Sequence, residues 1–356
     1  MSDLSKLSAA IGDLDAQAMS AAAARQDQLT KPAGSLGVLE QISIRLAGIK
    51  GRALPEIGDK AVVVMAADHG IAEEGTSAYP SEVTAQMVYN FARGGAAINV
   101  LALHEDVRVI VVDIGVKEDI DCDGVLLRKI RRGTANMAKG PAMARNEAIK
   151  AILTGAEIAG EAIRAGATII GTGDMGIGNT SAGSAIISVL GGLPLESVVG
   201  RGTGIDDAGL DNKLKALDRA LRINRPDKDD PVDVLAKVGG LEIAGLTGVI
   251  LGCAAKRTPV VIDGFISAAA ALVASKLAPK SVQFMIASHL SVEPGARYAM
   301  AEIGLTPMLH MDMRLGEGTG AVLAMNIIEA STKILIEMAT FAEAGVAEAE
   351  TVVETT

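Results

Sequence analysis

A single carboxylate, Glu317, lies between two glycines in the stretch "RLGEGTGA" (residues 314–321). Taken alone, a glutamate flanked by glycines is typical of a solvated turn. The same residue in a partly desolvated turn can act as a general base, because loss of solvent raises the pKa of a carboxyl group toward neutral pH. The choice between these interpretations depends on which other residues the fold brings to the same place.

Two further glycine-rich stretches have the composition of phosphate-binding loops. The stretch "GTGDMGIGNTSAG" (residues 171–183) follows an apolar run and leads into the apolar helical pattern "AGSAIISVL". Backbone amides before a helix can cradle a phosphate, and Thr180 and Ser181 add hydroxyl groups at the helix start. In the second stretch, "GRGTGIDDAG", Arg201 is a nearby cation, and Lys213 follows in the next helix. These loops indicate an anionic, phosphorylated small molecule as the ligand.

The letters "GTGDMG" also satisfy the GxGxxG fingerprint of dinucleotide-binding loops. Two features disfavour NAD. The run of glycines continues past the third glycine, and the nearest later acid, Glu196, follows "GGLPL" in an expected loop instead of ending a second strand. A phosphorylated ligand is therefore preferred to a dinucleotide.

Histidines and aspartates also follow apolar runs. His69 and His289 have no Ser or Cys partner at motif spacing, so a hydrogen-bonded structural role is preferred to catalysis for both. Asp68 and Asp263 could hydrogen-bond sugar hydroxyls or tie loops together, and both roles stay open. The two cysteines are far apart and have no metal-ligand spacing, so no metal site is predicted.

Seven short apolar runs are expected to be the strands that position these loops. Continuous β-branched runs separated by helical patterns indicate an α/β fold, a mostly parallel sheet with helices on both faces. Ligands bind beyond the carboxyl ends of such strands, where the glycine-rich loops would converge and Glu317 becomes a candidate general base. The expected strands are residues 61–67, 107–115, 167–173, 197–202, 259–264, 282–288 and 308–315.

Both ends of the chain have helical patterns. Residues 1–55 and 325–356 are expected to form a small helical subdomain, and residues 56–324 a large α/β domain for substrate binding and catalysis.

The composition disfavours several classes of partner. A formal net charge of −10 and an aromatic content of 2% argue against nucleic acid and anionic membranes. The N-terminal stretch lacks the basic and apolar regions of a signal peptide. The most apolar window, residues 243–255, is shorter than the roughly 20 residues of a membrane span. We therefore expect a soluble, cytoplasmic protein.

Seven stretches, in order and over nearly the whole chain, match one pattern: "LTKPAGSLGVLE", "ADHGIAEEGTSAYPSEVTAQMV", "FARGGAAINVLA", "GTGDMGIGNTSAGSAI", "VGRGTGIDDAGL", "GGLEIAGLTG" and "LGEGTGA". They resemble the nicotinate-nucleotide:dimethylbenzimidazole phosphoribosyltransferase family. The resemblance implies a Rossmann-like parallel sheet, a small helical domain from both chain ends, and a dimer. It implies transfer of 5-phosphoribose from nicotinate mononucleotide to 5,6-dimethylbenzimidazole or a related lower-ligand base, giving the α-ribotide and nicotinate in cobamide (vitamin B12) biosynthesis. No metal or redox cofactor is implied.

The resemblance also assigns roles to single residues. The family's catalytic base is the glutamate of the GEGTG loop, here Glu317, which would take the proton of the incoming base nitrogen. Leu315 and Gly316 beside it become substrate-binding candidates. The GNTS and GRGTG loops of the family bind the nucleotide phosphate, which carries over to Gly176, Gly178, Asn179, Thr180, Ser181, Gly202 and Lys213.

The chain departs from the family pattern at two places. Where the family loop reads GEMGIGNT, this chain has Asp174, an acid one methylene shorter, which we expect to support Glu317 in catalysis. Tyr79, Gln86 and Met87, in "SAYPSEVTAQM", match base-contacting positions only loosely. The acceptor is therefore left open among benzimidazoles, purines and phenols.

Two alternatives to the benzimidazole transferase remain. A phenolic acceptor such as phenol or p-cresol would need the same general base, so the sequence does not separate it from a benzimidazole. A non-catalytic subunit that stabilises an active paralogue in a heterodimer, in place of a homodimer, is the alternative of another class. Retention of Glu317 and of both phosphate loops argues against that alternative.

Overall fold

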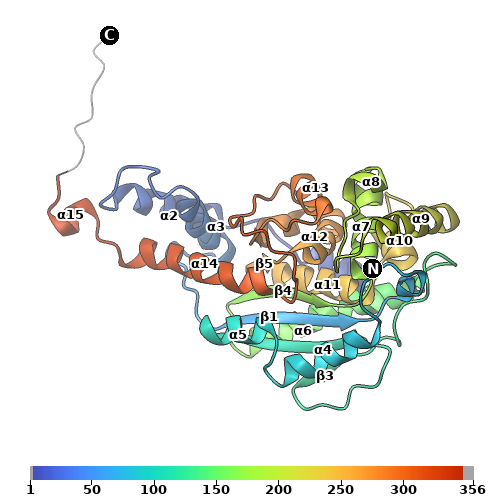
Figure 1. The fold of residues 1–356 in the computed structure, drawn as a ribbon. Helices are drawn as coiled ribbons and strands as arrows, with labels where there is room; N and C mark the ends of the chain where they lie inside the picture. Colours follow the sequence, from blue (N-terminus) through green and yellow to red (C-terminus); the bar gives the residue numbers. More distant parts are fainter. Residues whose placement is uncertain (1–2, 348–356) are drawn as a thin grey trace, which may run out of the picture. The chain divides into compact units, whose positions relative to one another are not determined.

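The computed structural model describes residues 3–347, and a six-stranded sheet forms the centre of its larger unit (Figure 1). All paired strands are parallel, in the order β3-β2-β1-β4-β5-β6. The expected α/β fold is therefore confirmed. The strands are β1 (Lys60–Ala67), β2 (Val107–Gly115), β3 (Val125–Leu127), β4 (Ile169–Met175), β5 (Val260–Ile262) and β6 (Met285–Ala287).

The direction in which strands are added reverses between β1 and β4. β1 pairs with β2 on one side and with β4 on the other, and Lys60 is level with both Val107 and Ile169. Loops that leave two such strands diverge to opposite sides, which opens a crevice at their carboxyl ends. The residues after β1 and β4 are therefore where a ligand site is expected.

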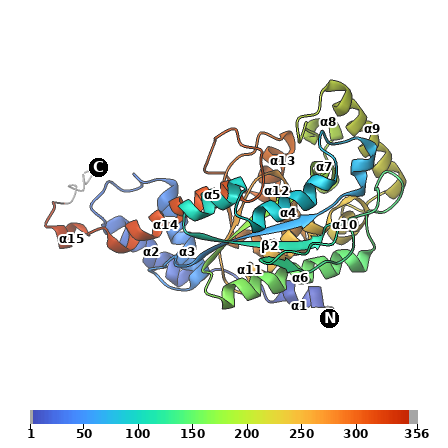
Figure 2. The same ribbon diagram turned by 60° about the horizontal axis from the view of Figure 1, so that its bottom comes forward.

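Helices cover both faces of the sheet, which explains why its central strand is a continuous apolar run. The side chains of residues 61–67 are fully buried in β1. Met65 points toward Gly245 of α11 (Leu241–Ala255), whereas Val62 points to the other face, toward Gly318. Figure 2 shows α6 (Arg145–Arg164) and α11 on one face and α4 (Glu82–Ala92) and α5 (Ala97–His104) on the other.

Small residues let α6 and α11 touch through their backbones. A Cβ atom on Gly155 would lie only 1.9 Å from the carbonyl oxygen of Gly245, and one on Gly248 would lie 1.8 Å from that of Ile152. No larger residue fits at these positions without moving a helix. The glycine-rich, aromatic-poor composition is thus a packing requirement of this helix pair.

Two of the seven expected strands are wrong. Residues 197–202 begin in a single helical turn, α8 (Leu195–Val198), and continue as the glycine loop. Residues 308–315 form no strand apart from one bridge between Leu309 and His289. The alternating apolar side chains there are not buried in a core: Met311 is 54% and Leu315 57% exposed, and Leu309 and Met313 are half-buried.

The other expected strands lie where predicted, with shorter bounds at β5 and β6. A 3₁₀ helix, Pro279–Phe284, replaces the first half of the expected strand 282–288, and the short edge strand β3 has no counterpart among the predictions. The remaining helices of the larger unit are α1 (Asp3–Ala9), a 3₁₀ turn (Gly70–Glu74), α7 (Asn179–Gly191), α9 (Asp207–Asn224), α10 (Pro231–Val238), α12 (Phe265–Leu277), α13 (Pro294–Ile303) and the first part of α14 (Thr319–Glu337).

By packing, the chain divides into two compact units. Among the described residues, the larger comprises residues 3–13 and 58–325, and the smaller comprises residues 14–57 and 326–347. The first helix, α1, therefore groups with the larger unit, near α6 and α11, instead of with the helical subdomain expected from residues 1–55. Residues 348–356 of that expected subdomain lie outside the described residues.

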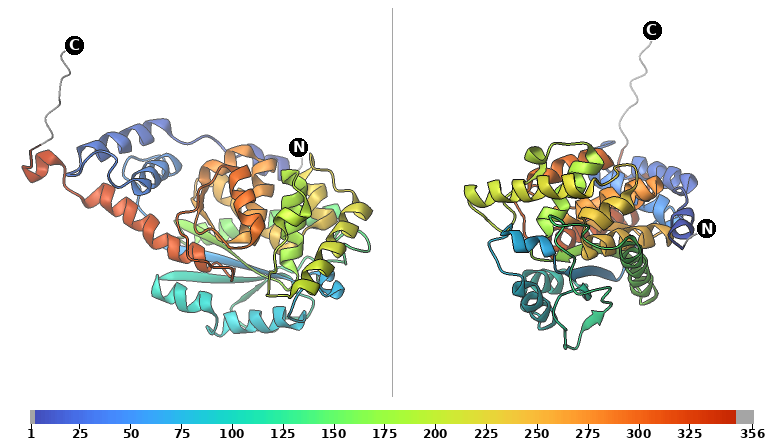
Figure 3. Two further views of the ribbon diagram at one scale, coloured as in Figure 1. Left: turned by 45° about the horizontal axis from the view of Figure 1, so that its top comes forward. Right: turned by 90° about the vertical axis from the view of Figure 1, so that its right-hand side faces the viewer.

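The smaller unit joins segments from both ends of the chain. It contains α2 (Ala16–Gln28), α3 (Val38–Lys50), the end of α14 and α15 (Phe341–Ala344), and Figure 3 shows its two segments side by side. Arg25 Nε donates to the carbonyl oxygen of Leu335 at 2.7 Å. The core residues of this unit include Ala18, Ala22, Ala47 and Leu335.

One helix in the described part of the chain, α14, is long and apolar enough to cross a membrane. Of its most apolar window, 56% is buried inside the protein. Its first turn is also bonded to Asp263, at the end of β5. We interpret α14 as a core helix, because its apolar side chains are already covered by protein.

Candidate active site

The carboxyl ends of four strands carry the titratable side chains of the site. Asp68 and His69 follow β1, Asp174 is the second-last residue of β4, Asp263 follows β5 and His289 follows β6. All five side chains are buried. The sheet thus places several acids and two histidines in a region from which water is largely excluded.

Glu317 lies in a turn of unusual backbone conformation. Gly316, Glu317 and Gly318 have consecutive φ angles of 84°, 62° and 92°. Two close contacts prevent side chains at the flanking positions: a Cβ on Gly316 would lie 3.1 Å from both carboxylate oxygens of Asp174, and one on Gly318 would lie 2.5 Å from Val62 Cγ2. The glycines around Glu317 are therefore needed for both conformation and space.

The Glu317 side chain is buried, with 5% of its surface exposed. Its Oε2 accepts a hydrogen bond from the backbone N–H of Ile98, in the first turn of α5, at 3.3 Å. Burial raises the pKa of Glu317 above its ordinary value; the Ile98 amide opposes this shift and the Asp263 charge adds to it. The interpretation of Glu317 as a solvated turn residue is therefore wrong, and a desolvated carboxylate is what a general base requires.

Asp174 connects the Glu317 turn to the glycine-rich loop after β4. Its carbonyl oxygen accepts from the N–H of Glu317 at 3.3 Å, and its Oδ2 accepts from Asn179 Nδ2 at 2.9 Å. Oδ1 is buried without a hydrogen-bond partner among the described residues. Burial raises the pKa of Asp174 well above its ordinary value, and the nearby acids Asp263, Glu242 and Glu317 raise it further.

Thr180, Lys213 and the GRGTG loop form one cluster, as expected for a phosphate site. Lys213 Nζ donates to Thr180 Oγ1 at 2.9 Å and to the carbonyl oxygen of Gly200 at 3.0 Å. The lysine side chain is fully buried, and burial lowers the pKa of Lys213 to about 8 against the opposing effect of Glu293. Gly202 lies so close that a Cβ there would be 2.6 Å from Thr180 Oγ1.

The start of α7 contains the remaining residues that were expected to bind the phosphate. Gly178 is its N-cap residue, with a φ of 94°, so the backbone amides that follow it are at the helix N-terminus. Ser181 Oγ is buried without a hydrogen-bond partner among the described residues. Asn179 instead turns its amide toward Asp174, and Gly176 packs against the backbone of Ala67.

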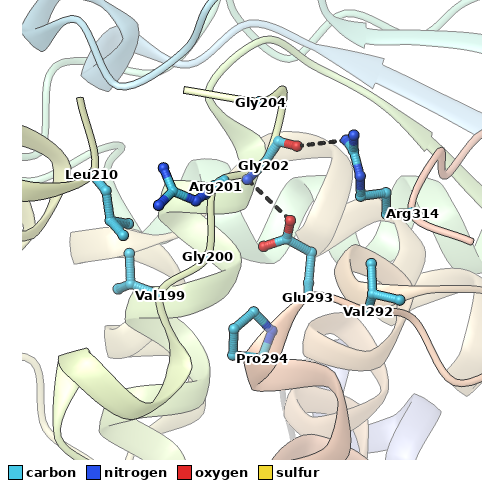
Figure 4. A pocket seen from close by; sticks show the side chains of 10 residues that line it. All are labelled: Val199, Gly200, Arg201, Gly202, Gly204, Leu210, Val292, Glu293, Pro294 and Arg314. Atoms are coloured by element: carbon cyan, nitrogen blue, oxygen red, sulfur yellow. Dashed lines mark hydrogen bonds between the residues drawn. The ribbon is translucent and has the colours of Figure 1, made fainter. Parts of the chain in front are cut away.

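A pocket of about 390 Å³ opens beside the GRGTG loop (Figure 4). Arg314 Nη1 donates to the carbonyl oxygen of Gly202 at 3.1 Å, and Glu293 Oε1 accepts from the N–H of Gly202 at 3.0 Å. Arg201 is held within its own loop, through the carbonyl oxygen of Ile205 and the carboxylate of Asp207. The pocket is lined by Val199, Gly200, Arg201, Gly202, Gly204, Leu210, Val292, Glu293, Pro294 and Arg314.

The expected acceptor residues lie on and before α4. Tyr79 is 56% exposed, Gln86 is exposed and Met87 is half-buried. The segment before α4 is tied to the GRGTG loop, since Ala78 N–H donates to Thr203 Oγ1 at 2.9 Å. No hydrogen bond or ion pair among the described residues joins Tyr79, Gln86 or Met87 to the Glu317 side chain. Leu315 is exposed and Gly316 is half-buried in the turn itself.

The two histidines differ in their partners. His69 Nε2 lies 2.6 Å from Glu242 Oε1, both side chains being buried, so the expectation of a hydrogen-bonded histidine is confirmed. His289 contradicts that expectation. Both of its ring nitrogens lack a hydrogen-bond partner among the described residues, and its Nε2 is 3.8 Å from Asp263 Oδ1.

Sequence reasoning missed three participants of the site: Glu242, Glu293 and the N-terminus of α5. Glu242 directly precedes the apolar window 243–255, and a single buried acid in so apolar a helix was a usable signal. The contact between Ile98 and Glu317 spans 219 residues of sequence, and it involves a backbone amide. No side-chain motif could have indicated it.

Comparison with known proteins shows the family of this chain. A family model described as "Phosphoribosyltransferase" matches residues 11–346. The nicotinate-nucleotide–dimethylbenzimidazole phosphoribosyltransferase of Chloroflexus aggregans is 59% identical over 95% of this chain and 96% of the relative. The protein of the same name from Geobacter sulfurreducens is 55% identical over 95% and 96% of the two chains.

A solved structure agrees with the sequence comparisons. The crystal structure of CobT from Thermus thermophilus superposes with a TM-score of 0.90 at 50% identity, covering 94% of this chain and 100% of that one. The chain is thus an enzyme of the pentosyl-transferring class, and it belongs to the phosphoribosyltransferase family of the nicotinate-nucleotide–dimethylbenzimidazole type.

Proposed function

We propose that this chain transfers the 5-phosphoribosyl group of nicotinate mononucleotide to 5,6-dimethylbenzimidazole or a related lower-ligand base. The products are nicotinate and the α-ribotide used in cobamide biosynthesis. The observation that carries the proposal is the junction at Asp174. This residue joins a buried, strained glutamate turn to the loop that leads into the Thr180–Lys213 cluster.

The reaction needs one base and no general acid. The acceptor nitrogen attacks C1′ of the ribose while the bond from C1′ to the pyridinium nitrogen breaks, and the electron pair of that bond neutralises the pyridinium. Nicotinate therefore leaves without being protonated. The acceptor nitrogen must lose its proton, which the carboxylate of Glu317 takes. A carboxylate with a raised pKa is the stronger base for this step.

The phosphate end of the nucleotide is assigned to the cluster around Lys213. Its ammonium group and the amides at the start of α7 offer a cation and N–H donors, and the Ser181 hydroxyl is unused. Holding the phosphate fixes the ribose carbon relative to Glu317, which is how positioning raises the rate. Asp174 then lies between the two ends of the donor, as a supporting residue.

A direct assay tests this proposal. Purified protein is incubated with nicotinate mononucleotide and, in separate reactions, benzimidazoles, purines and phenols, and nicotinate release is measured. We expect release with at least one benzimidazole. Absence of release with every acceptor would overturn the transferase proposal and favour the non-catalytic subunit. The kcat of a Glu317→Gln variant should be about 10²- to 10⁴-fold lower than that of the wild-type enzyme, since the amide cannot accept the proton.

We also propose that the protein works as a cytoplasmic homodimer. The support is an exposed apolar surface beside the sheet edge, where Val100 and Leu103 of α5 are 63% and 85% exposed and Leu127 of β3 is 55% exposed. Light scattering after size-exclusion chromatography should give twice the mass of the 356-residue chain. A Leu103→Glu variant that remained a dimer would exclude this surface as the interface.

A further inference from the structure

The conformation of the Glu317 turn requires an external support. Three successive residues have left-handed φ angles of 84°, 62° and 92°, and the middle one, Glu317, has a Cβ atom that makes this conformation costly. Such a turn persists only where its surroundings hold it.

The buried side chain of Asp263 bonds two amides of this segment, in addition to the bond from the Glu317 N–H to the carbonyl oxygen of Asp174. Asp263 Oδ2 accepts from the N–H of Gly318 at 3.1 Å and its Oδ1 accepts from the N–H of Ala321 at 3.0 Å. Both amides belong to the start of α14, where no carbonyl oxygen of the helix can accept from them. Asp263 therefore caps α14 across 55 residues of sequence, and the turn with Glu317 is fixed directly before that cap.

Asp263 is itself fixed by the sheet. Its N–H donates to Thr172 Oγ1 of β4 at 3.3 Å, and its carbonyl oxygen accepts from Ser288 Oγ, after β6, at 3.3 Å. The side chain is fully buried. The carboxylate is thus a rigid extension of β5, held from both neighbouring strands, so it can position the turn that depends on it.

The charges that face this carboxylate come from several elements. His289 Nε2 lies 3.8 Å from Asp263 Oδ1, and Asp174 of β4 and Glu317 are nearby acids. The charge of Glu242, on α11, raises the pKa of Asp174. A negative Asp263 disfavours ionised Glu317, so it makes that carboxylate a stronger base. Burial raises the pKa of Asp263, whereas His289 and the amides of Ala321 and Gly318 oppose this shift and favour the ionised carboxylate.

We propose that Asp263 is the positioning residue of the catalytic turn: it holds Glu317 through the amides of Gly318 and Ala321 and keeps a negative charge beside it. The inference rests on the proposed role of Glu317 as the base. Asp263 does not touch the reacting atoms in this scheme. It acts through Glu317, which distinguishes it from a residue that merely stabilises the fold.

The test uses Asp263→Asn in the full-length protein. Asparagine has one acceptor oxygen, and its NH₂ group would face an N–H donor, so the turn loses one of its two bonds and the charge together. We expect kcat to fall roughly 10²-fold while KM for nicotinate mononucleotide changes less than about threefold. The acid limb of the kcat profile should move to lower pH, because Glu317 loses the neighbour that raised its pKa.

A matched control is Asp113→Asn. Asp113 is also a fully buried strand-end carboxylate that accepts a backbone amide, that of Val116 at 2.9 Å, and it pairs with Lys129 at 3.0 Å. It lies on β2, and both of these partners are outside the Glu317 turn. This variant should be destabilised to a similar degree, with kcat and its pH profile close to those of the wild-type enzyme.

The double variant decides whether Asp263 acts through Glu317. Asp263→Asn combined with Glu317→Gln should be no slower than Glu317→Gln alone, because the second change removes what the first one positions. Additive losses, an unmoved acid limb or a wild-type kcat for Asp263→Asn would each overturn the inference while leaving the transferase intact. Full activity of Glu317→Gln would overturn the base itself, and Asp263 with it.

If Asp263→Asn does not fold, Asp263→Ser replaces it. Serine removes the charge and both amide contacts without placing a donor against donors, and the space left can take a water molecule. The same loss of kcat and the same shift of the acid limb are expected. A folded serine variant with the wild-type pH profile would overturn the proposal.

Discussion

Glu293 Oε1 accepts a hydrogen bond from the N–H of Gly202 at 3.0 Å, in the pocket beside the Thr180–Lys213 cluster. Its second oxygen is buried without a hydrogen-bond partner among the described residues. The carboxylate therefore takes the place of an anion at a group assigned to the substrate phosphate. Binding of the nucleotide requires Glu293 to move, or the phosphate to bind against its charge.

Replacing Glu293 by glutamine should tighten binding of nicotinate mononucleotide. Glutamine keeps the length of the side chain and one acceptor oxygen but removes the negative charge that opposes the phosphate. We expect KM for the nucleotide to fall roughly three- to tenfold, with little change in kcat. Initial-rate kinetics at saturating acceptor measure this. The control, Glu302→Gln, changes an exposed acid paired with Lys276 and should leave KM unaltered. A higher KM for Glu293→Gln would contradict the prediction.

The buried Lys213 should give nucleotide binding a basic limit near pH 8. Burial lowers the pKa of this lysine to about 8, so the ammonium group that we propose binds the phosphate is present below that pH and is lost above it. We expect kcat/KM to decline about tenfold per unit of pH beyond the limit, as for a single ionisation.

Lys213→Met provides the check on that assignment. This variant should raise KM roughly 10²-fold at pH 7, because charge-assisted hydrogen bonds to the phosphate are lost. Its kcat/KM should no longer decline near pH 8. Persistence of the same limb in the methionine variant would assign the ionisation to another group.

Asp174 should lower the stability of the folded protein as the pH rises. Burial raises the pKa of Asp174 in the folded state well above its unfolded value, so the folded protein binds the extra proton in the interval between the two. The stabilising contribution is complete below the unfolded pKa and is lost as the pH rises through the folded one. Asp174→Asn removes this dependence, so the stability of the variant relative to the wild-type protein should rise between pH 5 and pH 8.

Urea unfolding at those two pH values measures the effect. Asp113→Asn, which breaks an ion pair with Lys129, should lose stability relative to the wild-type protein at both values. If the free energy of unfolding of Asp174→Asn differs from that of the wild-type protein by the same amount at pH 5 and pH 8, the assignment of the extra proton to Asp174 is contradicted.

The sequence predicted the elements whose signal is local. β1 is a continuous apolar run because helices bury both of its faces, and β2 and β4 were recognisable from their shorter apolar runs. The run at residues 308–315 alternates just as regularly, but its apolar side chains are exposed or only half-buried, and periodicity carries no information about whether a core exists to receive them.

The candidate site followed the same rule. Glu317 and the phosphate loops were visible because glycines mark them. Asp263 and Glu242 were not assigned, because their partners are a pair of backbone amides and a histidine that only the folded chain brings near. The role of a buried acid depends on its neighbours in the folded structure. Residue type and spacing therefore identified Asp263 as a candidate but could not decide between its possible roles.

Gly318, directly after Glu317, should tolerate no side chain, because backbone strain and a steric conflict act there together. Gly304 has the backbone conformation without the steric conflict, so it serves as the control. Gly318 combines a φ of 92° with a neighbour, Val62 Cγ2, that would lie 2.5 Å from an added Cβ. Gly304, after α13, has a φ of 80° but open space around it. Gly304→Ala should therefore cost only the backbone strain, about 1 kcal/mol in the free energy of unfolding. Gly318→Ala should cost about 2–4 kcal/mol, because the steric conflict with β1 is added to that strain. It should also lower kcat, since relief of the conflict moves the turn that carries Glu317. Urea unfolding and steady-state kinetics on both variants separate the two terms, and equal losses of stability would show that the contact with Val62 is readily relaxed.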